Sequence, residues 1–122
     1  MPTKGTGPEQ RLCDALRAAG LRDFERTPSD VAGRPDVYFR RIRSVAVFVD
    51  GCAWHGCPIH YRPHANEEHG LARTAVDRQK HRDRVVRAAL AASGVRVLAF
   101  WEHDIDRGAL RIAKQVAEAL KA

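Results

Sequence analysis

Two aspartates, Asp36 and Asp50, are the residues of this sequence best suited to metal chemistry. Asp36 follows Pro35 at the start of a predicted strand, and Asp50 ends the next predicted strand. A tight reversal between the strands would fold the second back on the first and bring both carboxylates to one end of a sheet. Mg²⁺ prefers carboxylate oxygens together with phosphate and water, and a cation held there can activate water and polarise a phosphate. The alternative interpretation is an ordinary turn residue and an ordinary strand end.

The segment after the second aspartate concentrates thiols and imidazoles. Cys52, Cys57 and His60 have the spacing C-x4-C-x2-H. Thiolate and imidazole ligands at short separations in a loop are typical of structural Zn²⁺, which takes four ligands. His103, just past a later buried strand, is the candidate for a distant fourth ligand. The spare candidates are His64 and His69. The alternative is that these residues are ordinary thiols and surface histidines.

The apolar pattern predicts a mixed α/β domain that would position these residues. The predicted elements, in chain order, are a helix from Pro8 to Gly20, strands over 36–39 and 45–49, a helix over 71–92, a strand over 95–100 and a helix over 105–120. The strand over 45–49 is a continuous apolar run, which is typical of a buried strand, and the strand over 95–100 is expected to be buried as well. The irregular stretch 51–68 is typical of a functional or metal-stapled loop.

Length and composition indicate a single domain over residues 1–122. No apolar run approaches the ~18 residues of a membrane span, and the polar N-terminus lacks the apolar core of a signal peptide. We therefore expect a cytoplasmic protein with no membrane partner. Three cysteines, an odd number, argue against a disulfide framework. Cys13, beside Leu12 on the first predicted helix, is expected to be a buried structural residue.

The charge balance suits a polyanionic partner. The sequence holds 21 Lys and Arg residues against 15 Asp and Glu residues, a net charge of +6, and cationic side chains release counterions from nucleic acid phosphates. An arginine-rich genome composition is the alternative explanation. Five cations recur on one face of the helix predicted over 71–92: Arg78, Lys80, Arg82, Arg84 and Arg87. This face is predicted to contact phosphates, with a merely solvated helix face as the alternative.

Four sequence blocks together resemble the very short patch repair (Vsr) family of DNA-nicking enzymes. In chain order they are Gly33-Arg34-Pro35-Asp36, the run from Val45 to Pro58, Arg82-Asp83, and the run from Val95 to Glu102. The blocks have the order and similar gaps of that family, from about Pro8 to Ile105. The second block, VAVFVDGCAWHGCP, is the most specific of the four.

The resemblance implies a restriction-endonuclease-like PD-(D/E)xK core, with a mixed central sheet flanked by helices and a zinc-stapled loop. Asp36 and Asp50, fourteen residues later, match the spacing of that motif. Cys52 occupies the place of the motif's lysine, as it does in Vsr-like proteins. Asp50 replaces a histidine found in one branch of the family.

The resemblance also implies roles for individual residues. Asp36 would be the principal Mg²⁺ ligand, and Asp50 would share the cation. His55 would be the general base or would position the water, a task that suits an imidazole of near-neutral pKa. Glu9 matches a glutamate near the family's metal site. Zn²⁺ would fix the loop that presents Trp54 to DNA, and its ligands would be Cys52, Cys57, His60 and His103.

Several positions depart from the family in the part that reads the substrate. Vsr enzymes recognise a T:G mismatch by wedging aromatic side chains into the base stack. Trp54 remains, but its aromatic neighbour is replaced by Ala53, and a later aromatic pair appears as Leu71-Ala72. The family's following lysine and asparagine appear as Ala75 and Gln79, and its N-terminal DNA-embracing segment has no counterpart before Pro8. We therefore expect a nuclease whose substrate is not restricted to T:G mismatches.

The sequence as a whole predicts a Mg²⁺-dependent, zinc-stapled endonuclease that nicks double-stranded DNA and leaves a 5′-phosphate and a 3′-hydroxyl. Its role would lie in DNA repair or in defence against foreign DNA, with a protein partner supplying specificity. The candidate DNA contacts are Trp54, Arg78, Lys80 and Arg82. One alternative is a zinc-stabilised DNA-binding module that has lost catalysis. Another is a nuclease acting on RNA or single strands.

Overall fold

A computed structural model describes residues 7–41, 43–51 and 73–121. The elements, in chain order, are α1 (Pro8–Ala18), β1 (Glu25–Arg26), β2 (Val37–Phe39), β3 (Val45–Asp50), α4 (Arg73–Ala92), β4 (Arg96–Trp101) and α5 (Glu102–Lys121). The strands form one sheet in the order β1-β2-β3-β4. The pairs β1–β2 and β2–β3 are antiparallel, and β3–β4 is parallel. The predicted mixed α/β fold with a mixed sheet is confirmed.

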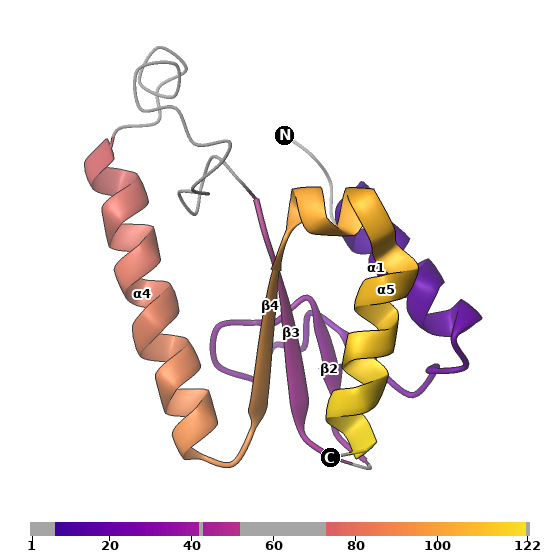
Figure 1. Ribbon diagram of the computed structural model, residues 1–122. Coiled ribbons are helices and arrows are strands. Elements are labelled where there is room, and N and C mark those ends of the chain that lie inside the picture. The colour runs from indigo at the N-terminus through magenta and orange to yellow at the C-terminus, as the bar shows by residue number, and fades with distance from the viewer. Residues whose placement is uncertain (1–6, 42, 52–72, 122) are drawn as a thin grey trace.

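The helices cover the two faces of the sheet as separate layers (Figure 1). On one face lie α1 and α5, which pack against each other, and on the other lies α4, which contacts β4. Since α4 precedes β4 in the chain and β3 pairs with β4 in parallel, α4 belongs to the crossover that parallel pairing requires. No helix in the described part of the chain is long and apolar enough to cross a membrane.

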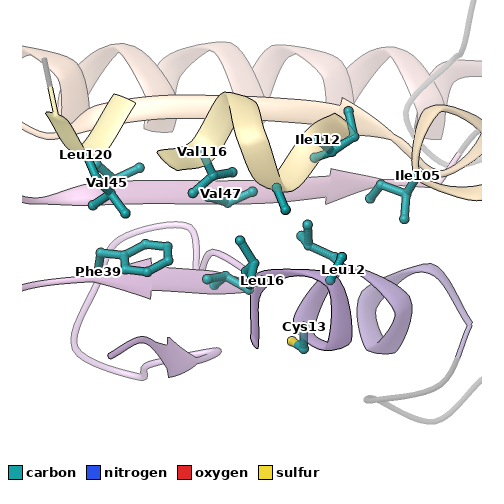
Figure 2. Close-up of a cluster of buried hydrophobic side chains, with 13 residues drawn as sticks. Leu12, Cys13, Leu16, Phe39, Val45, Val47, Ile105, Ile112, Val116 and Leu120 are labelled. Atoms are coloured by element: carbon teal, nitrogen blue, oxygen red, sulfur yellow. The ribbon is translucent and has the colours of Figure 1, made fainter. Parts of the chain in front are cut away.

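The larger core lies between the sheet and the layer of α1 and α5 (Figure 2). Leu12 and Leu16 of α1, one turn apart, are fully buried there. Alternate β3 residues face them, with Val45 and Val47 on this side of the sheet, as expected from the period of a strand. Cys13 is buried in the same core, and burial raises the pKa of its thiol, which fits the predicted structural role.

A smaller core fills the space between the sheet and α4. It contains the other face of β3, Ala46 and Phe48, together with Leu90 of α4. Strand β3 is therefore covered on both faces, which explains why its sequence is an unbroken apolar run. The prediction of a buried central strand is confirmed for β3. The prediction of a second buried strand was wrong, because β4 lies at the edge of the described sheet and its residues are half-buried or exposed.

Several predicted boundaries differ from the structure. Asp36 precedes β2 instead of opening it, β3 runs through Asp50, and β4 spans Arg96–Trp101. The two-residue strand β1 was not predicted, because it exists only through its pairing with β2. Helix α5 begins directly after β4, three residues earlier than predicted. Its first turn contains Glu102 and Asp104, and acidic residues there interact favourably with the helix dipole.

Gly33 fixes the turn before Asp36 against α4. The Arg34 amide donates a 3.0 Å hydrogen bond to the Val31 carbonyl, and Gly33 in this turn has φ +78°. A Cβ at Gly33 would lie 2.5 Å from Cγ1 of Val86 and 3.4 Å from the Phe48 ring. Both the backbone angle and the close approach to α4 therefore require glycine at this position.

We expect Gly33→Ala to lower the free energy of unfolding by about 2–4 kcal/mol, because left-handed backbone strain adds to overpacking against α4. Gly20→Ala is the matched control, since Gly20 has φ +85° but open space around its Cβ position. That variant should lose only about 1 kcal/mol. Urea unfolding measures both, and equal losses would show that the contact with α4 contributes nothing.

Candidate active site

A cleft of about 350 Å³ lies between the end of the sheet that carries the two aspartates and α4. Its lining combines three acidic and three basic side chains with a small apolar floor. The residues that line it are Gly33, Arg34, Asp36, Phe48, Val49, Asp50, Gln79, Arg82, Asp83, Val86 and Arg87. The structure therefore brings Asp36 and Asp50 to one site, as their spacing predicted.

Asp36 is held at this cleft by the backbone of β3. Its Oδ2 accepts a 2.6 Å hydrogen bond from the Val49 amide, and its carbonyl accepts a 3.2 Å bond from the Thr27 amide. The side chain is half-buried. The turn at Gly33 and the neighbouring strand thus set the position of this carboxylate before any ligand enters.

Asp50 makes a bidentate ion pair with Arg87 of α4. Arg87 Nη2 donates to Oδ1 at 2.6 Å and Nη1 donates to Oδ2 at 2.9 Å. The Asp50 residue is 6% exposed and the Arg87 side chain 19% exposed. Arg87 also lies over the Phe48 ring, with its Cζ 4.4 Å from the ring centroid. A guanidinium and a carboxylate are therefore fixed together inside the cleft.

Arg87 was expected on the exposed cationic face of its helix, and this expectation was wrong. Burial acts to lower the pKa of its guanidinium, but the hydrogen bonds and charge of Asp50, with smaller contributions from Asp83 and Asp36, outweigh burial and raise it. The Arg87 side chain lies among these acids, which line the same cleft. Arg87 thus belongs to the acidic site.

Asp83 and Gln79 extend the site along α4. Gln79 Nε2 donates a 2.9 Å hydrogen bond to Asp83 Oδ1, and Arg82 Nη2 donates to Gln79 Oε1 at 2.9 Å. From the sequence, Asp83 belongs to the block Arg82-Asp83 and was expected to be an exposed acid of this helix with no chemical role. That block was the one signal in the sequence that could have placed Asp83 at the site.

The other predicted site residues lie at different places. Glu9 is half-buried in the first turn of α1, and it is not among the described residues that line the cleft. Of the predicted DNA contacts on α4, Arg82 lines the cleft, while Arg78 and Lys80 are exposed beside it. Two further candidates, His55 and Trp54, lie outside the described residues.

Of the predicted zinc ligands, only His103 lies within the described residues. It occupies the first turn of α5, its side chain is 13% exposed, and its Nε2 is 3.4 Å from Asp104 Oδ1. The parallel register pairs Asp50 with Trp101. Cys52 and His103 therefore each follow a paired strand end by two residues in the sequence. The ligand candidates outside the described residues are Cys52, Cys57, His60, His64 and His69.

Residues 7–41, 43–51 and 73–121 do not by themselves contain a complete set of metal ligands. Within these ranges, no three His, Cys, Asp or Glu side chains form a group that could hold a metal ion. The described part of the candidate Mg²⁺ site consists of Asp36 and Asp50, with Asp83 on the same cleft. Their oxygen donors are of the kind that Mg²⁺ takes together with water and phosphate, so the donor chemistry fits the metal.

The sequence is similar to those of known DNA endonucleases. A family model for the DNA mismatch endonuclease Vsr matches residues 1–61. The chain is 35% identical over 122 residues to the type II nicking enzyme V.NmeDIP of Neisseria meningitidis serogroup C, covering 98% of this chain and 80% of that protein. It is 44% identical over 105 residues to the type II nicking enzyme V.NaeI of Lentzea aerocolonigenes, covering 82% and 61%.

A third relative is the type II nicking enzyme V.XorIIP of Xanthomonas oryzae pv. oryzae, 35% identical over 111 residues, with 88% of this chain and 79% of that protein covered. The residue blocks that suggested the resemblance lie before β2, from β3 into the residues that follow it in the sequence, in α4, and from β4 to the start of α5. The aligned segments extend over nearly the whole chain. The chain belongs to the Vsr family of DNA mismatch endonucleases.

Proposed function

We propose that this chain is a divalent-metal-dependent endonuclease that nicks one strand of double-stranded DNA. The observation that carries the proposal is the pair Asp36 and Asp50 in one cleft, with Arg34 and Arg82 also lining it. Carboxylates suit a cation, and guanidinium groups suit the phosphates on either side of the one that reacts. The names of the three relatives, all type II nicking enzymes, support cleavage of a single strand.

Asp36 would be the principal ligand of Mg²⁺, and Asp50, which is paired with Arg87 in this structure, would share the charge of the cation. Bound Mg²⁺ would supply Lewis-acid activation of the phosphate and of water. The hydrogen bond from the Val49 amide holds Asp36 in one orientation, and Arg82 would hold a neighbouring phosphate. His55 would accept the proton of the attacking water, and Glu9 would act from α1 on the metal's surroundings.

A structural Zn²⁺ completes the proposal. Its ligands would be Cys52, Cys57, His60 and His103, a set of soft and imidazole donors that fits this ion. Support comes from the β3–β4 register, since Cys52 and His103 follow two strand ends that lie side by side. The Zn²⁺ would hold the loop that carries Trp54 and His55 and would take no part in the chemistry.

The substrate would be duplex DNA in repair or in defence against foreign DNA, with a partner protein adding specificity. The residues of α4 give no reason to restrict the substrate to T:G mismatches. Gln79 stands where the family's mismatch reader has asparagine, and it is engaged with Asp83 and Arg82. Ala75, in place of a lysine, has no charge to offer a phosphate.

A second candidate is a zinc-stabilised DNA-binding module without catalysis. The observation that favours it is the ion pair of Asp50, because both carboxylate oxygens accept hydrogen bonds from Arg87. Such a pair would be retained in a cleft that no longer holds Mg²⁺. The two candidates differ in whether DNA is cut when a divalent cation is supplied.

The test is the conversion of supercoiled plasmid to the nicked circle in Mg²⁺ or Mn²⁺, with a chelator in a parallel reaction. We expect nicking that requires the cation, and comparable cutting of duplexes with a T:G mismatch and with T:A pairs. Cutting confined to the mismatch would contradict the broader substrate. DNA binding without any cutting in either cation would favour the inactive module.

A further inference from the structure

Several contacts hold the ion pair between Asp50 and Arg87 in place in the cleft. Two hydrogen bonds, of 2.6 and 2.9 Å, align the planes of the two groups, and the Phe48 ring supports the guanidinium from a third side. Arg87 approaches from α4, whereas Asp50 ends β3. The turn before Asp36 also lies close to α4, since a Cβ at Gly33 would lie 2.5 Å from Val86 Cγ1, so the pair is held between the sheet and α4.

This ion pair electrostatically disfavours the binding of a cation in the cleft. A guanidinium beside Asp50 cancels the negative charge that a divalent ion would use and adds a repulsion of its own at short range. Arg87 also feels the charges of Asp83 and Asp36, so its charge acts on the whole acidic side of the cleft. Without DNA, the cleft would therefore bind Mg²⁺ or Mn²⁺ more weakly than its carboxylates alone would allow.

We propose that Arg87 is a positioning residue that occupies Asp50 in the metal-free protein and releases it to the cation when DNA enters the cleft. The inference rests on the proposed function of the cleft. A DNA phosphate offers the guanidinium another bidentate acceptor, and the Arg87 side chain, though mostly buried, lines the cleft that the phosphate would enter. Metal binding and DNA binding are then coupled, and each strengthens the other.

The experiment measures Mn²⁺ affinity without DNA, from the electron paramagnetic resonance signal of unbound Mn²⁺. Arg87→Gln, which removes the charge but keeps a hydrogen-bond donor, should bind Mn²⁺ at least about tenfold more tightly than wild type. Arg87→Lys keeps the charge and should stay within about threefold of wild type, by the same Coulomb argument. Arg111→Gln on α5, an exposed arginine away from the cleft, is the matched control and should have no effect.

A second readout compares Mn²⁺ affinity without DNA with the Mn²⁺ concentration that half-saturates nicking. In wild type the half-saturating concentration should lie well below the DNA-free dissociation constant, because DNA draws Arg87 away from Asp50. In Arg87→Gln the two values should converge. A purely structural role of Arg87 would change stability and leave the ratio of these two values as in wild type.

If Arg87→Gln does not fold, a charge-matched comparison replaces it. Asp50→Asn alone leaves Arg87 facing the metal, so it should bind Mn²⁺ at least about tenfold more weakly than the double variant Asp50→Asn/Arg87→Gln. Equal affinities of these two proteins would overturn the inference.

The proposed function and this inference fail in different ways. Mn²⁺ binding that is lost in Asp36→Asn but unchanged in folded Arg87→Gln overturns the inference and leaves the proposed function intact. If neither wild type nor Arg87→Gln binds Mn²⁺ in a way that depends on Asp36, both are overturned.

Discussion

Asp36→Asn should abolish strand cleavage while the protein remains folded. The carboxylate would draw the divalent cation to the phosphate, and losing several kcal/mol of transition-state stabilisation corresponds to a rate at least about 10³-fold lower. The fold should survive because the oxygen of an asparagine amide can accept the same hydrogen bond from the Val49 amide as Oδ2 does. Initial rates of plasmid nicking at saturating Mn²⁺, with circular dichroism as the check on folding, measure the effect.

The matched control for this variant is Asp14→Asn. Asp14 is exposed on α1, away from the cleft, and accepts a hydrogen bond from the Gln10 side chain. The same loss of charge there should therefore leave the nicking rate unchanged. If Asp36→Asn and wild type nick at equal rates, catalysis does not involve this cleft.

The largest expected effect on stability comes from removing zinc. Protein purified without chelator should contain about one Zn²⁺ per chain, because a structural site takes four ligands and this sequence offers one such set. Structural Zn²⁺ can contribute on the order of 10 kcal/mol to folding, so Cys52→Ala and His103→Ala should lose the metal and much of the cooperative thermal transition. Elemental analysis and thermal unfolding, with and without chelator, give the two measurements.

Cys13→Ala serves as the control for the zinc ligands. Cys13 of α1 is buried in the core, where a free cysteine acts as a small apolar residue. It should keep the zinc content of wild type. Zinc that persists in Cys52→Ala, or that disappears in Cys13→Ala, would show that the ligand set is different.

The parts of the fold that could be predicted are those in which one chemical pattern determines the outcome. The apolar run from Val45 to Val49 required burial on both faces, and β3 is buried on both faces. The spacing of Leu12 and Leu16 required one helix face, and that face carries the core. The approach of Asp36 and Asp50 followed from antiparallel pairing of two neighbouring strands.

The parts that could not be predicted depend on partners distant in the sequence. Arg87 has the sequence context of a surface helix, and only the meeting of α4 with the end of β3 turns it toward Asp50. Strand β1 has too few residues to show a period and exists through β2. The non-helical backbone at Gly108 within α5, with φ −171° and ψ 71°, likewise has no signal beyond the glycine itself.

The packing of α1 against α5 has a consequence for how the chain acquires its structure during synthesis. Leu12 and Leu16 are buried in the same core as Ile112 and Val116, which are synthesised much later because they lie far along the chain. Such contacts between distant parts of a chain close slowly, and until they form the early apolar residues stay exposed to chaperones and to one another. The segment that matches the family model, residues 1–61, holds α1, β2 and β3 but nothing of α5. The half of the sequence by which the family is recognised is therefore not a unit that can complete this core on its own.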